Sequence, residues 1–252
     1  MTTLEPIGGT AAAGTLYGIG VGPGDVRYLT LRAAALVAAV DVIAYFAKAG
    51  REGNARRTVA PLLDAGRPEI KLEYPVTNEL PVGHPEYQRQ IADFYAKAAE
   101  TLAGCLARGQ SVGLLAEGDP FFFGSFMHMW RRLEADFAVE VVPGVTGMSG
   151  CWTRANTPIT WGDDILTVLT GTLDEAVLAR RLSETDAAVI MKVGRNLEKV
   201  RRAVVAANCL ARAIYIERGT MAGERIVPLS ECRDASGPYF SMVLIPGQGR
   251  RI

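Results

Sequence analysis

The chain has 252 residues, 49% of them apolar and 21% charged, which is typical of a globular protein and does not favour a disordered one. Lys and Arg number 27 and Asp and Glu number 27, so no basic excess favours nucleic acid or an anionic membrane as a partner. Four scattered cysteines and two histidines predict reduced thiols in a cytoplasmic protein and no metal site. Neither a secretory signal nor an apolar run long enough for a membrane span is evident.

Strands and helices alternate through the first half of the chain. Residues 1–14 are expected to form a flexible tail. Apolar and β-branched runs then predict strands at 15–20, 42–46, 69–74, 111–116 and 138–142. Helical periodicity predicts helices at 30–39, 55–64, 85–108 and 121–135, with Thr30 as the first N-cap. This alternation indicates parallel strands joined by crossover helices, with ligands at the carboxyl ends of the strands.

The second half resumes this rhythm after a Pro-, Gly- and Asp-rich stretch at 156–164, which is interpreted as a linker. Strands are expected at 165–170, 187–192, 213–217, 224–228 and 239–245, and helices at 174–184 and 197–208. The last strands have no helices between them, so part of this sheet should be antiparallel. The prediction is therefore two α/β domains, 15–155 and 165–252, with the active-site cleft between them.

The first glycine-rich motif, GIGVGPGD at 18–25, directly follows the first strand. Its glycines permit either a tight turn or a close approach of the backbone to a ligand. A dinucleotide-binding loop is disfavoured, because GxGxxG is not satisfied and Pro23 lacks the N–H that a pyrophosphate cradle uses. Asp41 also precedes the second strand, whereas a ribose-binding acid should follow it.

Four further motifs follow strands in the same way. They are EGDPFFFG at 117–124, VPGVTG at 142–147, IMKVGR at 190–195 and IERGTM at 216–221. The first of them fits a type I turn as well as a ligand loop, and the second taken alone is a plain turn. Catalytic triads, P-loops and HExxH motifs are absent from the sequence, which excludes most hydrolase and kinase classes.

Taken in order, the five motifs resemble those of the tetrapyrrole (corrin/porphyrin) methylase family, over residues 15–247. The resemblance implies a homodimer of two-domain α/β subunits that binds S-adenosyl-L-methionine as methyl donor. It also implies that the first loop, with Pro23, faces the tetrapyrrole. The positions that match donor-binding residues of the family are Pro23, Gly118, Asp119, Phe122, Thr146, Gly147, Met191, Gly219 and Ser241.

Within the family, the runs at 163–169 and 215–221 and the segment GSFMHMW resemble the members that methylate carbon 20 of precorrin-2 to precorrin-3A in cobalamin biosynthesis. Two positions depart from that pattern: the sequence has LTGTL where LPGTL is expected, and Gly147 where relatives often carry serine. Within the family, the alternatives are methylation of cobalt-precorrin-2, of uroporphyrinogen, or of another position of the corrin ring. An NAD-dependent oxidoreductase or a non-enzymatic binding module are alternatives outside it.

Methylation of a meso carbon requires a proton acceptor, and the octacarboxylate substrate calls for cationic partners. A base within hydrogen-bond reach of carbon 20 would remove its proton. The candidates in the motif regions are Asp119, Glu117, His128 and Asp163, and the sequence does not choose among them. Arginines bind carboxylates through two parallel bonds, although for any single arginine a solvated position on the surface is the favoured interpretation. Those near the motifs are Arg27, Arg131, Arg132, Arg154 and Arg195.

Overall fold

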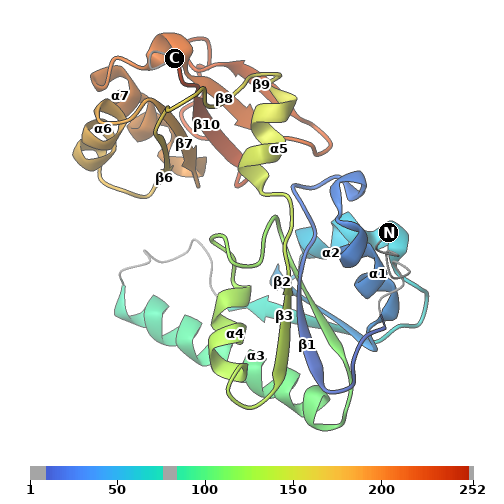
Figure 1. The fold of residues 1–252 in the computed structure, drawn as a ribbon. Coiled ribbons are helices and arrows are strands. Elements are labelled where there is room, and N and C mark those ends of the chain that lie inside the picture. Colours follow the sequence, from blue (N-terminus) through green and yellow to red (C-terminus); the bar gives the residue numbers. More distant parts are fainter. Residues whose placement is uncertain (1–9, 76–83, 250–252) are drawn as a thin grey trace, which may run out of the picture. The chain divides into compact units, whose positions relative to one another are not determined.

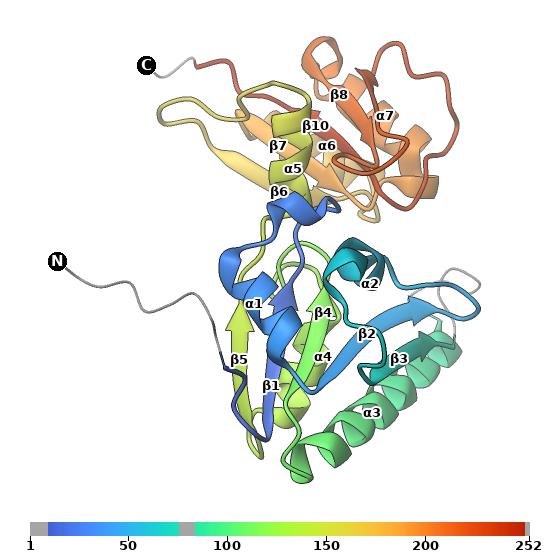
Figure 2. The same ribbon diagram turned by 90° about the vertical axis from the view of Figure 1, so that its right-hand side faces the viewer.

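The computed structural model describes residues 10–75 and 84–249, and the chain divides into two compact units, Met1–Thr146 and Gly147–Ile252. Figures 1 and 2 show that each unit has its own sheet and its own helices. The mixed α/β class expected from the sequence is confirmed. Each unit is described separately below.

The first unit contains a five-stranded parallel sheet in the order β3-β2-β4-β1-β5. Its strands are β1 (Thr15–Gly20), β2 (Val42–Lys48), β3 (Glu69–Tyr74), β4 (Val112–Ala116) and β5 (Ala138–Val142). Its helices are α1 (Leu31–Ala39), α2 (Asn54–Val59), α3 (Pro85–Ala107) and α4 (Phe126–Leu133). The all-parallel pairing confirms the crossover arrangement predicted from the alternation.

Helices cover both faces of this sheet, α1 and α2 on one side and α3 and α4 on the other (Figure 1). All six residues of the interior strand β1 are buried, as expected of a parallel strand covered on both faces. Leu16 packs on the α3–α4 side and Tyr17 on the α1–α2 side. Gly18 leaves room for Phe126, because a Cβ at Gly18 would lie 2.3 Å from that ring.

The ends of these helices follow the expected capping chemistry. The Thr30 side chain accepts a hydrogen bond of 3.1 Å from Ala33 N, as predicted for an N-cap. Helix α3 begins at Pro85, which lacks the N–H that a helix start leaves unpaired. The first nine residues of the predicted tail lie outside the described residues. The rest of it is held in place, because Gly14 N donates to Gly109 O at 3.0 Å.

The second unit contains a mixed five-stranded sheet in the order β6-β7-β10-β8-β9. Its strands are β6 (Leu166–Thr170), β7 (Ala187–Met191), β8 (Ile214–Glu217), β9 (Arg225–Pro228) and β10 (Ser241–Ile245). Strands β6 and β7 are parallel, whereas β10 is antiparallel to β7 and β8, and β8 to β9. The predicted antiparallel part of this sheet is thus confirmed. Its helices are α5 (Gly147–Arg154), α6 (Glu175–Ser183) and α7 (Leu197–Ala206).

Helix α5 was not predicted, and it changes where the chain divides. It packs on the face of the second sheet opposite α6 and α7, where Cys151 joins Ile216 and Leu244 in one apolar cluster. This contact assigns residues 147–154 to the second unit, whereas the sequence analysis placed them in the first domain. The stretch interpreted as a linker is also packed: Ile159 is 8% exposed and its carbonyl accepts from Gly247 N at 2.8 Å.

Two searches of the described residues were negative. Within residues 10–75 and 84–249, no helix is long and apolar enough to cross a membrane. The same residues contain no group of three or more His, Cys, Asp or Glu side chains that could hold a metal ion. All four cysteines are free and buried.

Candidate functional site

Three loops of the first unit meet at Gly20, Gly118 and Gly144, which we call the glycine junction. A Cβ on Gly144 would lie 2.0 Å from the Gly118 carbonyl oxygen, and one on Gly20 would lie 2.6 Å from Gly144 N. Gly118 and Gly22 exchange backbone hydrogen bonds of 2.9 and 3.3 Å. The motif glycines therefore allow the loops after β1, β4 and β5 to pack backbone against backbone.

The Asp119 carboxylate holds this junction together. One oxygen accepts from Phe121 N at 2.9 Å, which closes a local turn, and the other accepts from Gly144 N at 3.1 Å. Both carboxylate oxygens thus accept hydrogen bonds from backbone N–H groups of the first unit. The expectation that Asp119 contacts the methionine part of the donor stays a prediction. Phe122, on the same turn, is half-buried, and its ring lies 4.9 Å from that of Phe123.

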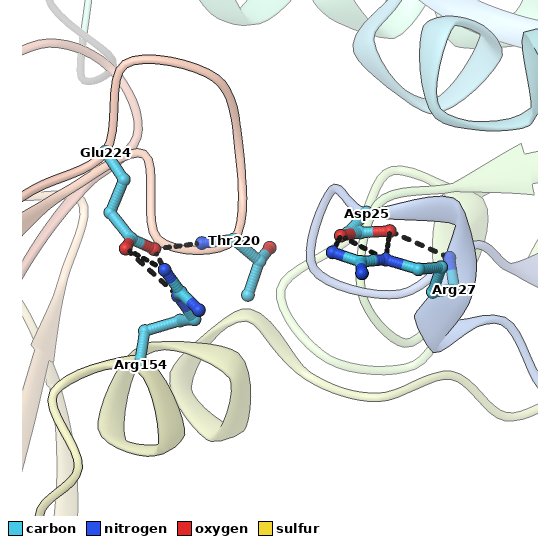
Figure 3. A network of polar contacts seen from close by, with 5 residues as sticks. All are labelled: Asp25, Arg27, Arg154, Thr220 and Glu224. Atoms are coloured by element: carbon cyan, nitrogen blue, oxygen red, sulfur yellow. Dashed lines mark hydrogen bonds and ion pairs between the residues drawn. The ribbon is translucent and has the colours of Figure 1, made fainter.

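The first glycine-rich loop ends in a paired arginine (Figure 3). Pro23 is half-buried, and the Asp25 carboxylate accepts from Arg27 N at 2.9 Å and from the Arg27 guanidinium at 3.0 and 2.6 Å. The Arg27 side chain is 82% exposed, and Asp25 raises the pKa of its guanidinium. The loop thus presents a charged and oriented guanidinium to solvent.

The predicted donor-binding positions of the second unit differ in what surrounds them. Met191 ends β7 and is half-buried against the apolar cluster beside α5. A Cβ on Gly147 would meet no atom within 4 Å, so the start of α5 faces open space. The Ser241 hydroxyl already has two hydrogen-bond partners within the unit: it accepts from Gly194 N at 3.0 Å and donates to Pro238 O at 2.8 Å. Thr146, the last residue of the first unit, is half-buried.

Residues 217–220, which we call the ERGT turn, leave β8 in a strained conformation. Arg218 and Thr220 have φ angles of 49° and 68°, in the left-handed region that non-glycine residues rarely adopt. Between them, Gly219 packs on helix α5, where a Cβ would lie 2.6 Å from Cys151 Sγ.

An ion pair holds the ERGT turn (Figure 3). The Glu224 carboxylate accepts from Thr220 N at 2.7 Å and from the Arg154 guanidinium at 2.7 and 2.9 Å. Arg154 lowers the pKa of the Glu224 carboxyl below its ordinary value. The Thr220 Oγ1 atom itself is buried and has no hydrogen-bond partner among the described residues.

The candidate proton acceptors lie in different environments. Glu117 follows β4; its side chain is exposed, yet the density of protein around it reduces its hydration and raises its pKa, opposed by a hydrogen bond with Asn54. His128 is exposed and stacks on Tyr95 with ring centroids 4.0 Å apart. Reduced hydration and the charge of Arg132 lower its pKa. Asp163 is exposed in the segment before β6.

Some features of the site gave no signal in the sequence. Arg154 and Glu224 are 70 residues apart, and only the fold brings α5 and the β8–β9 loop together. The Ser125 hydroxyl likewise lies 2.5 Å from that of Tyr74 and 3.1 Å from that of Tyr95, which come from two other elements. Of the remaining arginines, Arg132 donates to His128 O at 2.9 Å. Arg131 and Arg195 are exposed.

The fold and these loops define a methylase of known type. Residues 15–232 match the model of the tetrapyrrole (corrin/porphyrin) methylases, and the chain belongs to this family. It is 53% identical over 234 residues to a precorrin-2 C(20)-methyltransferase from Sinorhizobium sp, across 93% of this chain and 96% of that one. It is 27% identical to a cobalt-precorrin-2 C(20)-methyltransferase from Salmonella typhimurium, across 93% and 97% of the two chains.

Solved structures agree on the fold. The cobalt precorrin-4 methyltransferase CbiF superposes with a TM-score of 0.68 at 20% identity, over 92% of this chain and 95% of that one. The uroporphyrin-III C-methyltransferase of Thermus thermophilus, complexed with S-adenosylhomocysteine, gives 0.62 at 22% identity, over 94% and 99%. At these identities the likeness establishes a shared fold and no more.

Proposed function

We propose that this chain transfers a methyl group from S-adenosyl-L-methionine to carbon 20 of precorrin-2, giving precorrin-3A in cobalamin biosynthesis. The observation that carries the proposal is the 53% identity to the Sinorhizobium precorrin-2 C(20)-methyltransferase along 93% of the chain. The match is nearly end to end, so it includes every motif loop rather than a single conserved segment.

The residues present suit the donor. Open space at Gly147 accommodates a bound group beside the first turn of α5, and half-buried Met191 offers an apolar surface for an adenine ring. The donor supplies an electrophilic methyl group on a sulfonium. A nucleophilic carbon attacks this methyl group in line with the sulfur, which leaves as a thioether. Such a displacement depends mainly on positioning, so the fixed loops of both units contribute by holding their ligands in one orientation.

The proton released at carbon 20 needs an acceptor, and we propose Glu117. The enamine carbon attacks the methyl group, and the electrons of the carbon–sulfur bond remain on sulfur. The proton on carbon 20 then passes to the carboxylate, and its bonding electrons restore the conjugated system. Among the four candidates, Glu117 adjoins the glycine junction, and its raised pKa makes it a stronger base than an ordinary carboxylate.

The variant Glu117→Gln tests this assignment. We expect kcat to fall by about 100-fold or more, with little change in donor affinity, because an amide cannot accept the proton. Wild-type kcat should fall at low pH with a midpoint above the ordinary carboxyl pKa, since only the ionised form is a base. His128→Asn is the matched comparison. A large loss of kcat in this variant, with Glu117→Gln near wild type, would assign the acceptor to His128 instead.

The substrate carboxylates call for a cationic partner, and Arg27 is the arginine best suited to the task. Asp25 holds its guanidinium in one orientation and leaves it 82% exposed, so little side-chain entropy remains to be lost on binding. We also propose that the protein is a homodimer and that it acts in the cytoplasm.

The active-site cleft that the sequence analysis expects between the two units also stays a prediction.

A substrate comparison tests the function as a whole. The purified protein is incubated anaerobically with S-adenosyl-L-methionine and, separately, precorrin-2, cobalt-precorrin-2 and uroporphyrinogen III, and products are followed by mass spectrometry. We expect one added methyl group with precorrin-2 and a lower kcat/KM with the other two. Preference for cobalt-precorrin-2, the substrate in the Salmonella relative's name, would shift the assignment to the metal-bearing substrate. Preference for uroporphyrinogen III would refute it.

A further inference from the structure

Helix α2 begins close to the carboxyl ends of two neighbouring strands, β2 and β4, and contacts both. A Cβ on its N-cap, Gly53, would lie 2.6 Å from the ring of Tyr45 and 2.7 Å from the carbonyl oxygen of Phe46, both in β2. Only glycine lets the helix start so near a backbone atom. Tyr45 pairs with Leu115 of β4, so Glu117 leaves β4 two residues beyond this point.

The body of α2 is fixed by packing. Ala55 and Val59 are buried in the same apolar cluster as Leu115. The Thr58 hydroxyl donates to the carbonyl oxygen of Asn54 at 3.1 Å, within the first turn of the helix. The position of Asn54, the first residue of α2, is therefore set by the core of the unit rather than by a loop.

The half-buried side chain of Asn54 hydrogen-bonds the carboxyl group of Glu117. Reduced hydration is the larger influence on the pKa of this carboxyl and raises it, whereas the bond with Asn54 acts to lower it. A bond that lowers the pKa of an acid favours the ionised form. The Asn54 amide N–H is therefore the donor, and the Glu117 carboxylate is the acceptor.

The charged residues of α2 have other partners. Arg56 donates to Glu69 at 2.9 Å and also to Glu52, and Arg57 donates to Glu52 at 3.5 Å. Contact between α2 and the Glu117 carboxyl thus runs through a neutral amide. This arrangement suits a base, because an adjacent cation would lower the pKa of the carboxyl much further and weaken its basicity.

We propose that Asn54 is a positioning residue for Glu117, and that its side-chain amide holds the carboxylate in the orientation in which it accepts the proton from carbon 20. The proposal rests on the proposed function, since it concerns the base assigned there. A carboxylate has two oxygens, so an amide bound to one leaves the other for the proton. Holding a catalytic group in one orientation lowers the barrier to the reaction.

The variants Asn54→Leu and Asn54→Asp test this role. Both side chains are close to asparagine in size and lack the N–H donor, and Asn54→Asp covers the case in which leucine disturbs the fold. We expect kcat with precorrin-2 to fall about tenfold in each, with KM for both substrates within about twofold of wild type. The low-pH midpoint of kcat should move to higher pH, since the lost bond favoured the ionised form. Arg57→Gln, on the same helix and 60% exposed, is the control and should change neither quantity.

Two further measurements separate positioning from a general loss of structure. In the Glu117→Gln background, Asn54→Leu should cause no further loss of kcat, because no carboxylate remains to be oriented. NMR titration of the Glu117 carboxyl in the protein without substrate, assigned by its absence from Glu117→Gln, measures the contact directly. Its pKa should be higher in Asn54→Leu than in wild type.

Each other result counts against the proposal. An unchanged kcat and pH midpoint in both Asn54 variants, or an unchanged pKa in the titration, would remove Asn54 from this role. An equal loss of kcat from Asn54→Leu with and without Glu117 would show that the residue acts on the fold. A wild-type kcat in Glu117→Gln would overturn both the base and its positioning. Failure of the wild type to methylate precorrin-2 would instead overturn the proposed function, and the titration alone would then decide the contact.

Discussion

The glycine junction of the first unit and the ERGT turn of the second both follow strands and both contain motif glycines, yet they are built in opposite ways. At the junction, backbone meets backbone, and a Cβ on Gly144 would lie 2.0 Å from a carbonyl oxygen. At the turn, the strained residues are Arg218 and Thr220, and the glycine between them packs on a side chain. Backbone packing and the hydrogen bonds of Asp119 account for the first arrangement, whereas the second leaves a buried hydroxyl that has no hydrogen-bond partner among the described residues.

Gly144→Ala should produce the largest effect. Its new methyl group would collide with the Gly118 carbonyl, which cannot move without displacing the loop after β4. We expect the free energy of unfolding to fall by about 3 kcal/mol or more, measured by urea denaturation. Gly147→Ala is the matched control: no atom lies within 4 Å, and its stability should be unchanged or slightly raised. Equal destabilisation of both variants would mean that the junction is not packed as described.

Gly219→Ala should have a smaller effect that can be reversed. The added Cβ would lie 2.6 Å from Cys151 Sγ, a side-chain atom, so we expect a loss of about 1–3 kcal/mol in unfolding free energy. The double variant with Cys151→Ala removes the colliding sulfur and should recover part of that loss, as a double-mutant cycle would measure. Strict additivity of the two changes would contradict the contact. No second substitution of this kind can rescue Gly144→Ala, because its obstacle is backbone.

The Arg154–Glu224 pair should give the smallest effect, and one that depends on pH. The pKa of Glu224 is lowered from its ordinary 4.5, so its ionised form stabilises the folded state above pH 4.5. That contribution is lost as the pH falls below 4.5 through the lowered pKa. Because the Arg154 side chain is 49% exposed, Glu224→Gln should cost no more than about 1 kcal/mol at pH 7. A stability difference that stays constant down to pH 3 would show that charge plays no part.

The sequence predicted the fold well where the signal is local. Strands such as Thr15–Gly20 and Glu69–Tyr74 were predicted with the bounds that the structure gives them, because buried runs flanked by glycine or proline mark both ends. Helix α5 was missed because its eight residues, GMSGCWTR, contain two glycines and follow a Pro-Gly turn. Its stability comes from packing on the second sheet, which no local pattern reveals.

The site was predictable as a set of loops but not as a set of contacts. Motif order located the ERGT turn and the glycine junction, yet the sequence did not reveal that Asp119 binds the backbone of Gly144 or that Ser241 is committed to Gly194 and Pro238. These bonds join residues that are distant along the chain. The same holds for the Arg154–Glu224 pair. The sequence analysis named Arg154 as one of five arginines near the motifs and did not identify Glu224 as its partner.

Carbon-13 NMR of the product, made from precorrin-2 and a donor labelled in its methyl group, tests the central claim most directly. The account predicts a single enriched methyl signal, coupled to carbon 20, and loss of the proton that this carbon carried. An enriched methyl on any other carbon, or no enriched product from a protein that still binds S-adenosylhomocysteine, would contradict the assignment of carbon 20 while leaving the family membership intact.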